Sequence, residues 1–75
     1  MKITLHEPCI ALIGENHPVT VLTGDYRARR EDASAVLNTR ACIYLALGSG
    51  LEVYGSESSW RELALLGLCQ ITHES

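Results

Sequence analysis

Residues 25–50 read DYRARREDASAVLNTRACIYLALGSG, and the structure assigned to this stretch decides the fold. At about 100° per residue, five apolar side chains within it share one arc of a helix, the face that would meet a sheet: Ala33, Val36, Leu37, Tyr44 and Leu47. The pattern predicts a long helix that begins between Asp25 and Asp32. It would end before Gly48, because glycine suits the left-handed conformation that follows a helix.

The segments on either side predict strands and one further helix. Alternation of Ile3 and Leu5 with polar residues predicts a half-exposed strand, and Ser59 with Glu62 has the spacing of a capping box that opens a second helix. Gly67 is expected to end that helix. The other predicted strands are Cys9–Ile13, 19–22, 51–54 and an optional closing strand over 68–72.

These elements follow the order β-β-β-α-β-α, with an optional last strand. The order predicts an α+β fold, in which two helices pack on one face of a small antiparallel sheet of three to five strands. A length of 75 residues leaves room for one domain only, spanning residues 1–75.

The amino-acid composition restricts the kinds of compartment and partner that fit this chain. The apolar fraction of 47% and charged fraction of 20% are those of a folded protein, and the net charge is −3. Three widely spaced cysteines among apolar neighbours do not form a disulfide framework, so we expect a reducing, cytoplasmic compartment. The N-terminus lacks the pattern of a signal peptide, and the longest apolar run, 41–47, is too short to span a membrane.

The only dense group of hydrogen-bond donors lies at the start of the decisive stretch. We expect it to bind a partner, because planar guanidinium groups bind carboxylates and phosphates in a bidentate manner; its members are Tyr26, Arg27, Arg29, Arg30 and, further along the predicted helix, Arg40. The alternative is that nearby acids neutralise these arginines. For Arg40, in the middle of the apolar arc, burial with a paired carboxylate and presentation to a partner both stay open.

The second predicted helix is apolar around most of its circumference. Leu65 projects between Arg61 and Glu62, where the core that holds Trp60 is hard to reach. A helix of this kind is either fully buried or forms an interface. We therefore expect self-association, or another apolar interface, through Trp60, Leu65 and Leu68.

No arrangement of residues points to catalysis. The histidines and cysteines lack the spacing of a zinc site, and no local group activates a thiol or hydroxyl. The loop 48–50 follows the predicted long helix, whereas a phosphate-binding loop precedes one. We expect no enzyme activity, no cofactor and no metal ion.

The positive prediction is a protein-binding module without chemistry of its own. In size, acidity and absence of catalytic motifs the chain resembles the small accessory proteins of phages and mobile elements, such as anti-CRISPR proteins. That resemblance implies an inhibitor of a host protein complex, and no sequence motif carries it, so no functional residue is transferred. The alternative is a small nucleic-acid-associated regulator that uses Arg27, Arg29, Arg30 and Arg40, although the acidic balance disfavours it.

Overall fold

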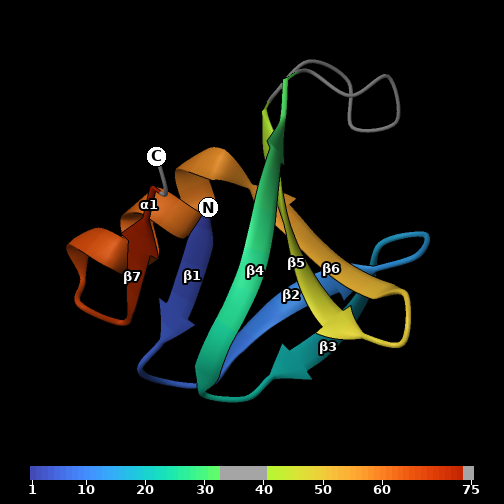
Figure 1. Ribbon diagram of the computed structural model, residues 1–75, viewed down its shortest axis with the longest axis horizontal. Helices are drawn as coiled ribbons and strands as arrows, with labels where there is room; N and C mark the ends of the chain where they lie inside the picture. Colours follow the sequence, from blue (N-terminus) through green and yellow to red (C-terminus); the bar gives the residue numbers. More distant parts are fainter. Residues whose placement is uncertain (33–40, 74–75) are drawn as a thin grey trace.

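In the computed structural model, which describes residues 1–32 and 41–73, antiparallel strands dominate (Figure 1). The described residues contain seven strands and one helix, in this order: β1 (Lys2–Leu5), β2 (Cys9–Ile13), β3 (His17–Val21), β4 (Gly24–Glu31), β5 (Cys42–Gly48), β6 (Leu51–Ser56), α1 (Glu57–Leu65) and β7 (Cys69–Thr72). The predicted fold class is therefore wrong, because a seven-stranded sheet with a single short helix replaces two helices on a small sheet.

The error lies in the decisive stretch, whose described parts form two strands of a sheet. Residues 28–31 of β4 pair with residues 42–45 of β5, in the register Ala28 to Leu45 and Glu31 to Cys42. Side chains of these two strands therefore alternate between two faces with a period of two, so Tyr44 and Leu47 do not lie on a helix. The other members of the predicted arc, Ala33, Val36 and Leu37, lie outside the described residues. Gly48 ends a strand and not a helix, and lies at the turn into β6. Arg40 lies outside the described residues.

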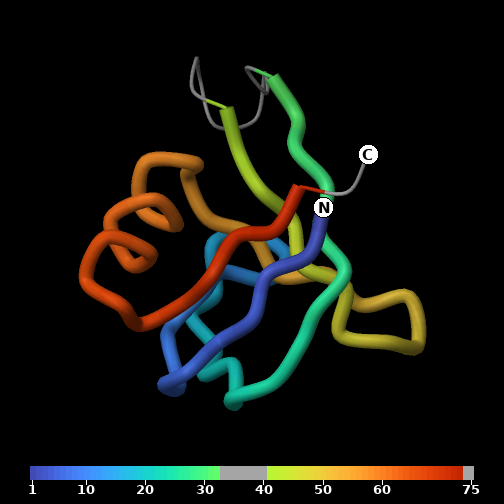
Figure 2. The backbone as a smooth tube through the Cα atoms, turned by 60° about the vertical axis from the view of Figure 1, so that its left-hand side comes forward, coloured from blue at the N-terminus to red at the C-terminus, as the bar shows by residue number. Residues whose placement is uncertain are grey.

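The sheet is continuous but changes direction at β4. Its strand order is β3-β2-β6-β5-β4-β1-β7, and every described pairing is antiparallel. The first half of β4 pairs with β1 and its second half pairs with β5, so β4 alone joins the β1–β7 pair to the other strands. Figure 2 shows the resulting curl, with β1 and β7 side by side and α1 next to them.

The core fills the concave side of this curled sheet and is mainly aliphatic. Its largest fully buried side chains come from several strands, and α1 adds Trp60, which is 2% exposed; the other members include Ile3, Val21, Ile43, Leu45 and Val53. The indole Nε1 of Trp60 donates a hydrogen bond to the carbonyl oxygen of Ile43, 3.3 Å away. This bond attaches the helix to the middle of the sheet.

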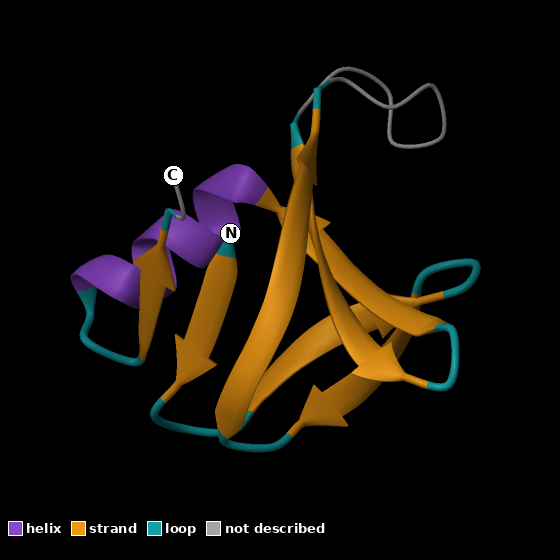
Figure 3. Cartoon of the chain, in the orientation of Figure 1, coloured by secondary structure: helices purple, strands orange, loops and turns teal. Residues whose placement is uncertain are grey.

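The helix begins three residues before the predicted capping box. Ser56 is the N-cap, and its Oγ accepts a hydrogen bond from the backbone N–H of Ser59 at 3.2 Å. Its other end agrees with the prediction: Gly67, with φ of +77°, follows the last turn, and its N–H donates to the Ala64 carbonyl. Figure 3 shows this helix at one end of the sheet, beside β1 and β7.

Two leucines in β5 distinguish the observed strand from the predicted helix. Leu45 is fully buried and Leu47 is 38% exposed, whereas the helical arc would bury Leu47 and leave Leu45 outside it. We expect Leu45→Ala to lower the free energy of unfolding by about 2–5 kcal/mol, and Leu47→Ala to cost much less. Urea denaturation of both variants measures the difference, and the reverse order would contradict the strand.

Candidate functional site

The predicted arginine cluster is divided between the two faces of β4. Tyr26 is half-buried against the core, and its hydroxyl donates to the carbonyl oxygen of Leu22 at 2.7 Å. Arg27 is exposed. Arg29 and Arg30 are consecutive residues of a strand, so their side chains leave opposite faces. The structure therefore divides these donors: Arg27 and Arg29 share one face of the strand, and Arg30 lies on the other.

Arg29 lies in a network on the outer face of the sheet. Its Nε and Nη2 donate to the two carboxylate oxygens of Glu52, each at 3.0 Å, and its Nη1 donates to Glu31. The guanidinium also stacks on the ring of Tyr44, with its carbon 4.2 Å from the ring centroid. The pKa of Arg29 is raised, first by its hydrogen bond to Glu52, and the same bond lowers the pKa of Glu52.

Arg30 connects β4 to the start of α1. Its Nε donates to Glu57 at 2.6 Å, and its Nη1 donates to Asp32. The hydrogen bond between Arg30 and Glu57 raises the pKa of the arginine and lowers that of the carboxyl group. Both arginines thus already hold carboxylates of their own chain, and a phosphate or an acidic peptide would have to displace them.

The predicted apolar interface is also divided between core and surface. Trp60 belongs to the core, Leu65 is 89% exposed, and Leu68 is half-buried. Leu66 is the exposed neighbour of Leu65 that the sequence analysis did not single out. Self-association through this end of α1 stays a prediction.

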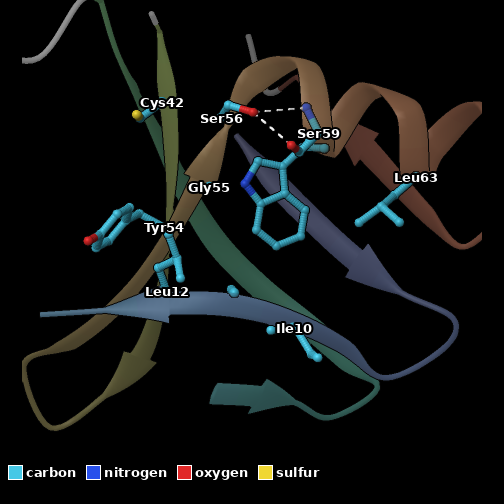
Figure 4. A pocket seen from close by; sticks show the side chains of 10 residues that line it. Ile10, Leu12, Cys42, Tyr54, Gly55, Ser56, Ser59 and Leu63 are labelled. Carbon is cyan, nitrogen blue, oxygen red and sulfur yellow. Dashed lines mark hydrogen bonds between the residues drawn. The ribbon is translucent and has the colours of Figure 1, made fainter. Parts of the chain in front are cut away.

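A pocket of about 370 Å³ lies between β2, β6 and α1 (Figure 4). Trp60 contributes to its lining, and the other lining residues are Ile10, Ala11, Leu12, Cys42, Tyr54, Gly55, Ser56, Ser59 and Leu63. None of them is an Asp, Glu, Lys, Arg or His, and burial raises the pKa of the Cys42 thiol, which favours its neutral form. The pocket is of the size and apolar character of ligand sites in proteins.

The pocket exists because β6 leaves β2 to become a helix. The two strands pair at one position, Leu12 with Tyr54. Two residues later β6 reaches Ser56, the helix cap, and the chain turns away. Trp60 closes the gap from the helix side, and its ring approaches Gly55, where a Cβ atom would lie 3.1 Å from the indole nitrogen. A glycine at this position therefore leaves room for the indole.

The walls of the pocket are held firmly. The hydroxyl of Tyr54 donates to the Gly14 carbonyl at 2.8 Å and accepts from the backbone N–H of Asn16 at 3.1 Å. On the helix side, the Oγ atoms of Ser56 and Ser59 are 2.7 Å apart. At the mouth, in contrast, Ile10 is 72% exposed although it is a large aliphatic side chain. The pocket therefore has fixed walls and an exposed apolar lip.

This site is not predicted from the sequence, although part of its signal is visible. The run Cys9–Ile13 is a strand, as predicted, and its apolar residues lie on both of its faces. The structure buries Ala11 and leaves Ile10 exposed. The other half of the pocket depends on the meeting of β2 and β6, which no local pattern reveals.

Among the described residues, no arrangement favours metal or thiol chemistry. Within residues 1–32 and 41–73, no group of three His, Cys, Asp or Glu side chains could hold a metal ion. Burial raises the pKa of Cys9 and Cys69, which keeps them as thiols near neutral pH. In the same ranges, no helix is long and apolar enough to cross a membrane.

Comparison with known proteins adds no relative: no protein-family model, curated protein or solved structure matches this chain.

The ion pair between Arg29 and Glu52 predicts a pH-dependent contribution to stability. The pKa of Glu52 is lowered from its ordinary value of 4.5 in the folded protein, so folding favours the ionised carboxylate. The stabilisation is complete above pH 4.5 and is lost as the pH falls through the lowered value. We expect Glu52→Gln to be less stable than the wild type at pH 7, with the difference shrinking as the pH falls below 4.5 and through the lowered pKa of Glu52.

Thermal unfolding followed by circular dichroism between pH 3 and pH 7 measures this difference. Glu62→Gln is the matched control, because Glu62 is exposed and makes no ion pair with a described residue. A difference that persists at low pH would show that the glutamine acts through packing and not through charge.

Proposed function

We propose that the protein is a protein-binding module that holds an apolar segment of its partner in the pocket beside Trp60. The observation that carries this proposal is the uncharged pocket with Ile10 exposed at its lip. Pockets that receive one large side chain are typical of the energetic centres of protein interfaces. The exposed surface of Ile10 would be removed from water by such a contact.

The arginines have a structural part in this proposal. Arg29 and Arg30 already bind Glu52, Glu57 and their neighbours in the strand, and these bonds hold β4 to β6 and to α1. The nucleic-acid alternative loses support for the same reason, because two of its four arginines are neutralised within the chain. Arg27 stays available on the surface as a peripheral contact.

The narrower prediction of an inhibitor from a phage or mobile element stays a proposal with no further support. The pocket is consistent with many kinds of protein partner and does not select a host complex. A cytoplasmic location is likewise a proposal, in keeping with the three cysteine thiols.

A library of displayed linear peptides tests the pocket directly. We expect peptides selected by the wild-type protein to contain a large uncharged apolar residue, and Ile10→Glu to reduce their affinity at least tenfold. The substitution lies on an exposed side chain, so the fold should persist. Trp60 is the only tryptophan in the chain and lines the pocket, so its fluorescence reports occupancy.

Leu65→Glu is the matched control, since it adds the same charge at another exposed aliphatic side chain, outside the pocket. Binding lost in the Leu65 variant and retained in the Ile10 variant would move the interface to the end of α1. A wild-type dimer that Ile10→Glu converts to monomers would assign the pocket to a second copy of this chain. A small molecule retained in native mass spectrometry would make it a ligand site instead.

A further inference from the structure

The pocket-facing edge of β2 carries backbone groups that the sheet does not use. Backbone N–H and C=O groups of successive residues point to opposite edges of a strand. Leu12 pairs with Tyr54 across the edge that faces β6. Its other neighbour is Pro18, which has no N–H to donate. Leu12 therefore directs its N–H and C=O toward β6.

Ile10 directs its backbone groups the same way, because it lies two residues from Leu12 in the same strand. If the ladder continued, its partner would be Ser56, but β2 and β6 are paired only at Leu12 among the described residues. Ser56 is instead the cap of α1. The N–H and C=O of Ile10 thus face the opening between β2 and α1, which is where the pocket lies.

From this geometry we infer that the partner segment is an extended strand, which pairs with Ile10 at the free edge of β2 and inserts a neutral apolar side chain beside Trp60. This inference rests on the proposed function and specifies its ligand. Strand addition to an exposed edge supplies affinity through main-chain bonds, and a side-chain pocket supplies specificity. The occupant is uncharged at the anchor because none of the lining side chains offers a charge to pair with.

The register follows from the alternation of side chains. The ligand residue opposite Ile10 has its side chain on the outer face, with that of Ile10. Its neighbour in the ligand points to the inner face, toward Trp60 and Ala11, and is the anchor. The amide of the anchor itself therefore points away from β2, and the amide of one adjacent residue donates to Ile10.

Single N-methylation of a selected peptide tests this register. The ligand residue opposite Ile10 is next to the anchor, and we expect methylation of its amide to weaken binding about tenfold or more. The methyl group removes the bond to Ile10 and adds bulk at the strand edge. Methylation of the anchor amide is the matched control and should be tolerated. Hydrogen exchange provides an independent readout: peptide binding should slow exchange of the Ile10 amide and leave that of Ala11, which faces β3, unchanged.

The possible outcomes test strand addition separately from the proposed pocket for a side chain. Peptides that lose affinity for Ile10→Glu but tolerate methylation at every position, with unchanged exchange at Ile10, would overturn strand addition and leave the pocket as a side-chain site. A library that yields no peptide dependent on Ile10 would overturn both. If methylation next to the anchor were tolerated and methylation of the anchor amide weakened binding, the register would be wrong.

Discussion

The pairing of β4 with β5 is the interaction on which the rest of the structure depends. Among the strands of residues 1–32 and 41–73, β4 alone joins β1 and β7 to the other four, because one half of it pairs with β1 and the other half with β5. Opposite Ala28, Leu45 lies in the centre of the core with no exposed surface. Without this pairing the concave side of the sheet would open, and α1 would lose the surface on which Trp60 packs.

This pairing also explains where prediction from the sequence succeeded and failed. Short elements with clear local signals were found: alternation at Ile3 and Leu5, the apolar run of β2, and the glycine after α1. The stretch 25–50 also contains a period of two, in which Tyr26 and Ala28 alternate with Arg27 and Arg29. A helical arc drawn over a longer window obscured it. Backbone hydrogen bonds to strands that are distant in the sequence favour the strand over the helix, and a local stretch of sequence does not contain these partners.

The predicted grouping of the arginines rested on the same helix as the predicted fold. On a helix, Arg29 and Arg40 would lie in line and the arginines would gather on adjacent stripes. On a strand, consecutive arginines separate to opposite faces, and each meets a carboxylate from a different element: Glu52 from β6 for Arg29, and Glu57 from α1 for Arg30. The sequence therefore identifies these arginines as hydrogen-bond donors, but it does not reveal which acceptors they meet inside the chain. A cluster of arginines with an equal number of acids nearby in sequence says little until the sheet register is known.

The pocket also follows from the way in which the strands use their backbone hydrogen bonds. A chain that changes from strand to helix must give up its ladder at the change, and β6 does so at Ser56, whose side chain caps the helix. The neighbouring strand receives no such compensation, so the N–H and C=O of Ile10 stay at the opening. Closing the gap by a small shift of α1 is opposed by the bond from Trp60 to Ile43 and by the close approach of its ring to Gly55. The indole is thus held at a fixed distance from β2, and an open edge beside a rigid apolar wall is the geometry that an incoming strand with one large side chain would satisfy.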